Sequence, residues 1–581
     1  MHHDPADPSA PQTAPAPATG AEKPARRGFL RGAGLAGAGA LGIAALTAPT
    51  AAQADKGKGA GKPEKPGPPK GPGTDGYVWL VGDHHLHSQY SNDAMYRIED
   101  QARRAVAGGL DWIVITDHGN EPFAAHSIEP QREDMLAARE RFGDELLLFN
   151  GLEWNIPAGE HTTLIMAPGE HEAEVLQEFV ERYDANVVDA RPGTSENEAL
   201  ALEALGFLEQ TRATGRLEDV LVLPNHPARK GIDSPSELRA WQDAAPEVVI
   251  GFEGAPGHQA ASLPAGMARG RGLYDGGSSE HSFPGYPEES YRTWGGFDWM
   301  TATVGGVWDS LLAEGRRWWI TTTSDGHQGC GDWVKNPVDE LQQTGYDDIP
   351  YNDAGDTFQT TGVFPPPVNA GRPVVEYSSF TPGAYNRTWV GATDRSHRAV
   401  MEGMRAGRMW VCFGDLIASL DMTLRVVGRG GKPHRAGLGG TLEVDRPTEV
   451  ELVLSIETAS QVNHAGLLPQ LARVDLILGT VTGPAEDRET ITAPATKVVT
   501  SWDTSGQDGT LELTHRFLLE EDSYLRVRGT DGKRSQPGFL GADIDPHGPA
   551  IDVPGEVDAW EDLWFYTNPI FASVRSAASG G

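Results

Sequence analysis

The most constraining feature of this chain is the repeated placement of metal-binding residue types directly after short apolar runs. Between residues 77 and 414, strand-like runs alternate with stretches of helical spacing. The polar groups that follow these runs are Asp83 to His87, Asp117-His118, Glu153, Asn225-His226, Glu253 and Asp325 to His327. In parallel α/β folds the carboxyl ends of the strands meet at one rim, where ligands bind. The pattern therefore predicts a parallel sheet or barrel with imidazoles and carboxylates gathered on its rim.

Two of these groups have the spacing of paired metal ligands. In His85-x-His87 and in Asp325-x-His327, side chains two residues apart at a strand end share one face. Glu153, on an intervening strand, offers a carboxylate that can bridge two ions. Imidazole and carboxylate together are typical ligands of Zn, Mn or Fe. A single His after a strand is more often an ordinary hydrogen-bonded group, so it is the combination that predicts a metal site.

The first 75 residues have the composition of a signal peptide and a linker. Residues 1–54 begin Pro/Ala-rich, carry Arg26-Arg27 before the small apolar run 33–48, and end in Ala52-Gln53-Ala54, which resembles a cleavage site. This pattern is typical of a twin-arginine signal, and the run is too weakly hydrophobic for a stable membrane span. We therefore expect export by the twin-arginine machinery, a secreted or extracytoplasmic location, and no stable membrane insertion after cleavage. Residues 55–75 form a Gly/Pro/Lys-rich linker.

The sequence beyond the linker indicates two folded regions. A length of 581 residues is too great for one ordinary core. Residues 76–415 carry the alternation described above, and residues 416–575 contain short runs of alternating apolar and polar positions, which is typical of an all-β sandwich. The formal charge of −34 disfavours nucleic acid as a partner. Cys330 and Cys412 form either one disulfide or two buried thiols, and their spacing does not decide between these alternatives.

Taken in order, the motifs resemble those of the polymerase and histidinol phosphatase (PHP) metallohydrolases. The matching residues are Asp83 to Ser88 as D-x-H-x-H-S, Thr116 to His118 as T-D-H, Glu153, His161, Asn225 to Pro227 as N-H-P, and Ser324 to His327 as S-D-x-H. The resemblance implies that residues 76–415 form an α/β fold, a distorted seven-stranded (βα) barrel with up to three metals at its carboxyl rim. The alternating C-terminal region is similar to that of exported PHP proteins, which include carbaryl-type ester hydrolases.

The same resemblance implies a set of metal ligands. It gives the first metal His85, His87, Glu153 and Asp325, the second Glu153, His161 and His226, and the third Asp93, His118 and His327. Some family members have His where Asp93 stands, and a carboxylate there favours Mn or Fe over Zn. His84 is then a spacer within D-x-H-x-H, while Asp83 and Asp117 are expected to orient imidazoles from behind. The expected cofactors are two or three divalent ions, which are Mn, Zn or Fe.

The chemistry expected of such a site is ester hydrolysis by a metal-bridging hydroxide. The favoured function is an exported phosphoesterase that acts on a small-molecule or polymer phosphomonoester or phosphodiester. Arg229 lies at the same rim to neutralise a phosphate, unless it is a solvated surface charge, and His258 is a weaker catalytic candidate. One alternative is a carboxylic or carbamate ester hydrolase with the same metals. Another is a non-catalytic cell-surface binding module stabilised by its metals. A catalytic metal site keeps an open coordination position and a structural one is closed, and the sequence does not distinguish the two.

Overall fold

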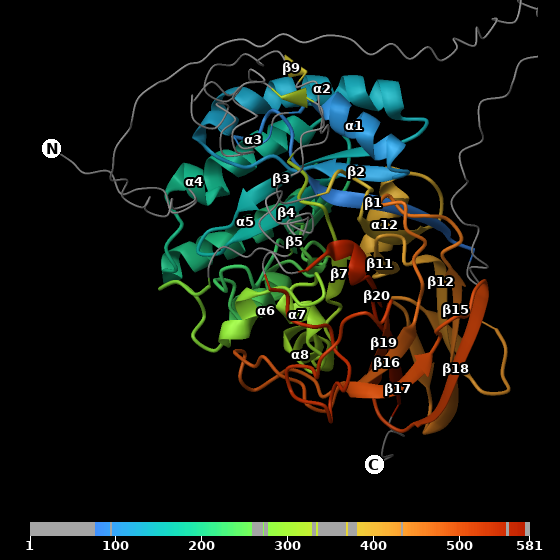
Figure 1. The fold of residues 1–581 in the computed structure, drawn as a ribbon. Coiled ribbons are helices and arrows are strands. Elements are labelled where there is room, and N and C mark those ends of the chain that lie inside the picture. Colours follow the sequence, from blue (N-terminus) through green and yellow to red (C-terminus); the bar gives the residue numbers. More distant parts are fainter. Residues whose placement is uncertain are drawn as a thin grey trace, which may run out of the picture. The chain divides into compact units, whose positions relative to one another are not determined.

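The computed structural model describes most of the chain after the predicted linker (Figure 1). The described residues are 76–92, 94, 96–257, 271, 277–327, 333–334, 368–369, 380–431, 434–553 and 557–575. The predicted signal peptide and linker lie outside them, as do Asp93, His258 and Cys330. Cys412 is a buried free thiol. Within the described ranges, no helix has the length and apolar character needed to cross a membrane.

The first half of the chain alternates strands and helices. Its elements, in chain order, are β1 (Val78–Leu86), α1 (Ile98–Ala107), β2 (Trp112–Ile115), η1 (Phe123–Ser127), α2 (Ile128–Phe142), β3 (Leu147–Asn155), β4 (His161–Met166), α3 (Glu172–Tyr183), α4 (Ala185–Val188), α5 (Ser195–Ala213), β5 (Val220–Pro224), α6 (Pro235–Ala244), β6 (Gly251–Ala255), η3 (Glu288–Tyr291), α7 (Trp299–Ala302), α8 (Val307–Ala313) and β7 (Trp319–Thr322). The strands β2, β3 and β5 are buried along their whole length, as expected for strands covered on both faces. In Figure 1 the blue helices α1 and α2 lie beside β2 and β3, which they contact.

Strand direction follows the length of the connections. Strands β1, β2 and β3 pair in parallel, as predicted, whereas β4 runs antiparallel to both β3 and β5. Only residues 156–160 join β3 to β4, and a connection so short cannot make the crossover that parallel neighbours require. The prediction of uniformly parallel strands is therefore wrong for β4, which is the second arm of a hairpin. In this hairpin Asn155 lies opposite His161.

Two isolated bridges connect the remaining strands of the first half. Val222 of β5 bridges Val249, just before β6, and β6 pairs in parallel with β7. Beyond β7, Gly326 bridges Leu86 of β1. The carbonyl of Gly326 also accepts a hydrogen bond of 2.9 Å from the amide of His87. The strands β1 to β7 thus follow one another around a circuit, and the end of β1 meets the segment that follows β7.

The second half of the chain is rich in strands, as its alternating sequence predicts. Its elements are β8 (Trp333–Val334), β9 (Val368–Asn369), β10 (Asn386–Ala392), α12 (His397–Arg405), β11 (Met409–Phe413), β12 (Ile417–Val426), β13 (Arg435–Gly437), β14 (Thr441–Val444), β15 (Thr448–Thr458), β16 (Arg473–Thr480), β17 (Lys497–Asp503), β18 (Thr510–Leu519), β19 (Ser523–Thr530), η6 (Ala559–Glu561), β20 (Trp564–Thr567) and β21 (Ile570–Val574). One sheet has the order β13-β12-β15-β18, and the other runs β14-β21-β19-β20 to β11, with β16 paired to β19 and β17 paired to β16. The protein is therefore a mixed α/β chain with a second, sheet-rich region.

The two regions share one continuous sheet. Strand β11 pairs with β20 on one side and with β10 on the other, and β10 pairs antiparallel with β1. The nine-residue β1 has room for two partners along one edge, because residues 78–82 face β10 while Leu86 meets Gly326. The predicted boundary between residues 415 and 416 falls between β11 and β12, and it stays a prediction.

A buried ion pair also connects the two regions. The carboxylate of Asp309 on α8 accepts hydrogen bonds of 3.0 Å and 2.7 Å from Nε and Nη2 of Arg526 on β19, and both side chains are fully buried. The Tyr524 hydroxyl and the Gly305 amide donate to the same carboxylate at 3.2 Å and 2.7 Å. Because a buried charge without its partner is strongly unfavourable, loss of either member costs far more than the intact pair contributes.

Asp309→Ala should therefore lower the free energy of unfolding by about 3–5 kcal/mol, because it leaves the Arg526 guanidinium buried without its carboxylate. Denaturant unfolding of the purified protein measures this change. Glu443→Ala is the matched control, since it removes an ion pair with Arg575 in which both side chains are more than half exposed, and it should change stability by less than about 1 kcal/mol. Equal effects of the two substitutions would contradict the role given to Asp309.

Candidate metal centre

Four side chains converge where strands β1, β3 and β7 end. His85 and His87 lie at the end of β1 and just beyond it, Glu153 lies on β3, and Asp325 follows β7. His85 Nε2 lies 3.1 Å from His87 Nε2. It also lies 3.3 Å from both Glu153 Oε2 and Asp325 Oδ1. His87 Nε2 lies 3.2 Å and 3.3 Å from the same two oxygens, and all four side chains are buried.

Glu253 of β6 fixes the orientation of His85. Its Oε1 lies 2.6 Å from His85 Nδ1 and accepts a hydrogen bond of 3.0 Å from the Thr323 hydroxyl. Its Oε2 accepts a hydrogen bond of 2.9 Å from the amide of His226. When the Nδ1–H of His85 donates to Glu253, the lone pair of Nε2 points toward the other three ligand atoms. Sequence reasoning assigns Glu253 no role, although its position directly after an apolar run was an available signal.

The spacings of these four ligand atoms fit a divalent metal ion. Five of the six separations between them are 3.1 Å to 3.3 Å. A regular tetrahedron with such edges has its centre about 2.0 Å from each corner, which is the usual length of Zn–N and Zn–O bonds. Burial lowers the pKa of His85, but Glu153, Asp325 and Glu253 raise it well above its usual range, so these carboxylates favour positive charge at this position. This donor set is typical of Zn, Mn or Fe sites.

Both oxygens of Glu153 contact imidazoles. Oε1 lies 2.8 Å from His161 Nδ1 and 3.3 Å from His226 Nε2. Oε2, which belongs to the four-atom group above, also lies 3.1 Å from His118 Nδ1. This is the arrangement that a carboxylate bridging two ions requires, and the assignment of each ligand to a particular ion stays a prediction.

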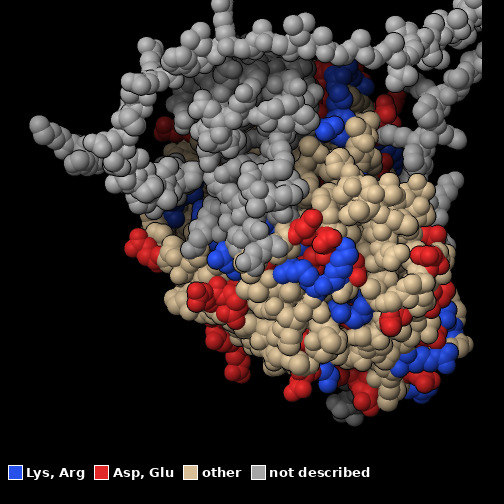
Figure 2. All heavy atoms as spheres, viewed as in Figure 1, with Lys and Arg blue, Asp and Glu red and all other residues tan. Residues whose placement is uncertain are grey.

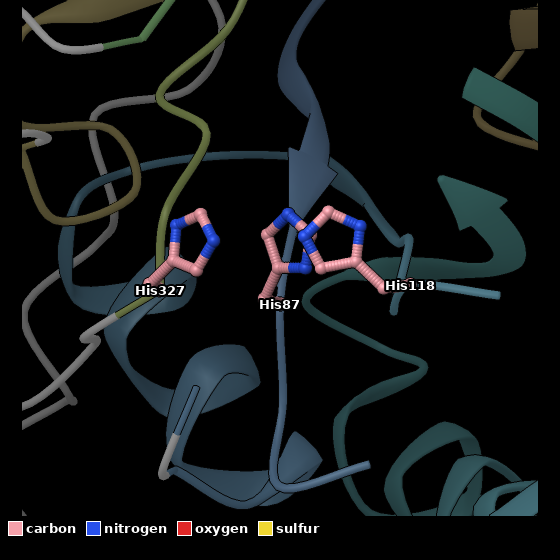
Figure 3. A group of neighbouring side chains, drawn as sticks. All are labelled: His87, His118 and His327. Atoms are coloured by element: carbon pink, nitrogen blue, oxygen red, sulfur yellow. The ribbon is translucent and has the colours of Figure 1, made fainter. Parts of the chain in front are cut away.

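A third group of imidazoles surrounds His87. His118 and His327 approach it from two sides (Figure 3), and one nitrogen from each of the three rings lies within 4.8 Å of the others. The rings of His87 and His327 are stacked, with centroids 4.0 Å apart. The predicted third set combines His118 and His327 with Asp93, which lies outside the described residues. The structure thus brings the two histidines together and adds His87, which the sequence places in the first set alone.

Two residues of this rim have left-handed backbone conformations. The φ angle is 31° at His226 and 50° at Asp325. Such conformations cost non-glycine residues of order 1–3 kcal/mol and persist where surrounding contacts hold them. The amide of His226 is held by Glu253, and Gly326, next to Asp325, is held against Leu86. Backbone strain at two candidate ligands is typical of a functional site.

Among the described residues, the acids next to the ligands accept hydrogen bonds from backbone amides and from the Ser88 and Gln131 side chains, and not from the imidazoles. Asp83 accepts hydrogen bonds from the amides of His85 and Ser324 at 3.2 Å and 3.1 Å. Asp117 accepts hydrogen bonds from the amide and the hydroxyl of Ser88 at 2.6 Å and 2.7 Å. This corrects the expectation that they orient imidazoles directly, because a carboxylate behind a strand end meets the amides of the turn first. Burial raises the pKa of Asp83 to about 7.

Burial and neighbouring charges set the ionisation of the candidate ligands. Burial lowers the pKa of His226 to about 3, and the nearby Arg229 contributes to that shift. Burial also lowers the pKa of His84 to about 3, and this ring contacts a threonine hydroxyl of β7 and not the cluster. Burial alone would raise the pKa of Glu153, but the surrounding imidazoles hold it well below its usual range. A neutral His226 and an ionised Glu153 are the states that bind a cation.

Arg229, the predicted phosphate-binding residue, lies beside the cluster and pairs with Glu160. Its Nη2 lies 2.5 Å from Glu160 Oε1, and Lys230 Nζ lies 3.2 Å from the same oxygen. Glu160 is buried and directly precedes His161. Burial would raise the pKa of Glu160, but Arg229 and its neighbours hold it well below the usual range. Sequence reasoning missed Glu160, while His258, the weaker candidate, lies outside the described residues.

Comparison with known protein families agrees with the geometry of this site. The family described as PHP domain matches residues 83–190, the segment that supplies His85, His87, Glu153 and His161. The chain therefore carries a PHP domain, which confirms the resemblance seen in the sequence. A comparison with curated proteins finds no match.

Similar solved structures exist at low identity. One is a two-domain protein from Bacteroides vulgatus containing a predicted PHP-like metal-dependent phosphoesterase; it is 16% identical, with a TM-score of 0.33 over 83% of this chain and 96% of that chain. Another is endonuclease Q in complex with a 27-mer duplex substrate that has an abasic lesion at the active site. It is 16% identical, with a TM-score of 0.19 over 32% of this chain and 46% of that chain. At these scores the function has to be argued from the site itself.

Glu253→Ala should lower metal affinity by roughly 10- to 100-fold, because the His85 ring loses the acceptor that fixes its orientation. Competition with a chromophoric chelator measures the affinity directly. The control is Glu172→Ala, which removes a buried carboxylate that pairs with Arg139 away from the rim. An unchanged affinity in Glu253→Ala would show that this carboxylate does not support the site.

Proposed function

We propose that the protein is a metal-dependent hydrolase that acts on phosphate esters. The proposal is carried by the group of His85, His87, Glu153 and Asp325, whose spacings fit one divalent ion and which continues through Glu153 to further imidazoles. Divalent ions in such a site lower the pKa of water and polarise an ester oxygen. The PHP domain at residues 83–190 supports the same class of function.

The chain's own residues divide into three proposed ligand sets. These are His85, His87, Glu153 and Asp325 for the first ion, Glu153, His161 and His226 for the second, and Asp93, His118 and His327 for the third. The proposed cofactors are two or three divalent ions, which are Mn, Zn or Fe. Glu253 keeps the His85 ring in place, and Asp83 and Asp117 hold the backbone turns on which the ligands lie.

Cationic side chains next to the ligands favour a phosphate ester. Arg229 and Lys230 both touch Glu160, and their side chains are 13% and 27% exposed, so each reaches the surface of the rim. Phosphoryl transfer spreads negative charge over three oxygens, which a guanidinium stabilises well. We assign this role to Arg229 and keep His258 as a second candidate. A carboxylic or carbamate ester gains less from such cations, and it is the alternative substrate for the same metals.

The proposed substrate is a small molecule or a polymer bearing an ester, without a role for nucleic acid. In Figure 2, basic and acidic side chains are interspersed over the visible part of the described surface. The formal charge of −34 also opposes binding to a polyanion through bulk electrostatics. The absence of nucleic-acid binding stays a prediction.

We also propose a more specific description of the fold, as a barrel followed by a β-sandwich. Strands β1 to β7 would be the seven strands of the distorted barrel, and residues 416–575 would form a β-sandwich. The bridges Val222–Val249 and Leu86–Gly326 support the first statement, since they join the two pairs of strands that lack a regular ladder.

His85→Ala and Asp325→Ala should each lose bound metal and hydrolytic activity together, with activity falling roughly a thousandfold or more, since several kcal/mol of charge stabilisation is lost. Elemental analysis of protein purified without chelators gives the metal content, and initial rates give the activity. His171→Ala is the matched control, because this exposed histidine pairs only with Glu174 among the described residues. Full metal content in His85→Ala would disprove the ligand assignment.

A substrate panel separates the competing functions. Metal-loaded protein is given phosphomonoesters, phosphodiesters, and aryl carboxylic and carbamate esters, and release of phosphate is compared with release of the phenol. Turnover of the phosphate esters supports the proposal, whereas turnover of the aryl carboxylic or carbamate esters alone favours the alternative. If no ester turns over with Mn, Zn or Fe, a non-catalytic cell-surface binding module becomes the better description.

We further propose that the protein is exported by the twin-arginine route to a secreted or extracytoplasmic location. Arg26-Arg27, the apolar run 33–48 and Ala52-Gln53-Ala54 support this proposal. Replacing both arginines with lysine should keep the precursor inside the producing bacterium, because the machinery reads the arginine pair. Immunoblotting of cell and extracellular fractions measures the result, and continued export would contradict the proposal.

A further inference from the structure

Arg191 lies close to the candidate ligand His161. Its Nη2 donates a hydrogen bond of 2.9 Å to Asn155 Oδ1, and its Nε donates one of 2.6 Å to Asn186 Oδ1. Asn155 is the cross-strand partner of His161 in the β3–β4 hairpin. Both acceptors are neutral amides, and no ion pair joins Arg191 to a carboxylate in the described part of the chain. Arg191 is exposed, so its guanidinium presents positive charge beside the rim, and the buried carboxylate of Asp184 lies within its electrostatic reach.

Asp184 holds the two amide acceptors of Arg191 in place. Its carboxylate accepts hydrogen bonds of 3.0 Å from Asn155 Nδ2 and 3.0 Å from the backbone amide of Asn186. The carbonyl of Gly119 also accepts a hydrogen bond of 2.7 Å from Asn155 Nδ2. Since the Nδ2 group is fully engaged, Oδ1 of Asn155 is turned toward Arg191. A guanidinium fixed through Nε and one Nη keeps N–H donors for a ligand.

Two more cations lie beside Glu160, the residue that precedes His161. Glu160 contacts Arg229 and Lys230 through a single oxygen, Oε1. Burial lowers the pKa of Lys230, and Arg229 and Arg191 lower it further, so the three cations are within electrostatic reach of one another. Two carboxylates, those of Glu160 and Asp184, stand against these three cations. This local excess of positive charge occurs in a chain whose formal charge is −34.

We propose that Arg191 and Lys230 form a second anion-binding subsite beside the metal centre, and that the substrate carries a phosphate or carboxylate in addition to the phosphate ester that is cleaved. This inference rests on the proposed phosphoesterase function. The ester lies at the metal ligands, while the second anionic group reaches across the hairpin end to the fixed guanidinium and the ammonium. Charge-assisted hydrogen bonds to such groups add affinity and fix the orientation of the bound substrate.

Matched substrates test the subsite. They are the monophosphate of an alkanediol, the corresponding bisphosphate, and the phosphate ester of a hydroxycarboxylate of the same length, each in a series of two to six carbons. The wild-type protein should have a kcat/KM at least about tenfold higher for the best dianionic substrate than for its monophosphate. The phosphate and carboxylate arms identify which second anion is preferred.

Arg191→Gln and Lys230→Gln should each reduce this preference by about tenfold, mainly through KM. Arg398→Gln on α12 is the control, because Arg398 is an exposed arginine paired with Glu402 away from the rim, and the preference should persist. Calorimetry with propane-1,3-bisphosphonate and propylphosphonate gives a second readout that needs no turnover. The bisphosphonate should bind more tightly than the monophosphonate, and Arg191→Gln should remove the difference.

The failures of the two proposals are distinguishable. Equal kcat/KM for the mono- and dianionic esters, unchanged in Arg191→Gln, would overturn the subsite and leave the phosphoesterase in place. Absence of turnover for every ester, with bisphosphonate binding still dependent on Arg191, would overturn the phosphoesterase and still support the anion subsite.

Discussion

The crowding of imidazoles around the carboxylate of Glu153 is the constraint on which the rest of the site depends. Within the described residues, five imidazole nitrogens lie 2.8 Å to 3.3 Å from its two oxygens. Hydrogen bonds to Glu253 and Ser91 already occupy the Nδ1 atoms of His85 and His87, so their Nε2 lone pairs face the same space. Such a concentration of electron-pair donor atoms is favourable when metal cations bind between them. Metal binding then contributes to folding as well as to chemistry.

The fold creates this crowding by closing its strands into a circuit. His85 and Asp325 are far apart in sequence, and they meet because Gly326 bridges Leu86. The short β3–β4 hairpin then brings His161 to within 2.8 Å of Glu153. The left-handed backbone at Asp325 is a local cost of this closure that the surrounding contacts offset.

Local patterns in the sequence were sufficient to predict the class of fold and much of the candidate site. The spacing of His85 and His87 follows from strand geometry alone, and the ordered motifs indicated a PHP domain, now matched at residues 83–190. The direction of β4 depends on a five-residue connection and not on its own periodicity. The role of Glu253 was not predicted and Glu160 was missed, because partners distant in sequence set the roles of both residues. The ligand assignments themselves stay predictions.

Asn568 of the C-terminal region and Thr388 of β10 hold strand β7, which leads to the candidate site. Asn568, which follows β20, accepts a hydrogen bond of 2.8 Å from the amide of Ile320 and donates one of 3.0 Å to its carbonyl, so it holds the middle of β7. Thr388 of β10 makes the equivalent pair of contacts, both 2.8 Å, with the backbone of Thr322. Strand β10 also pairs with β1.

These contacts fall on the two strands that lead into the first proposed ligand set. Strand β1 ends in His85 and His87, and β7 leads to Asp325. A shift of either strand by even a fraction of an ångström would change the separations of 3.1 Å to 3.3 Å between the ligand atoms. Metal ligands bind well only when held close to their productive geometry by packing and hydrogen bonds behind them. Strand β10 and Asn568 of the C-terminal region therefore hold the rim in position.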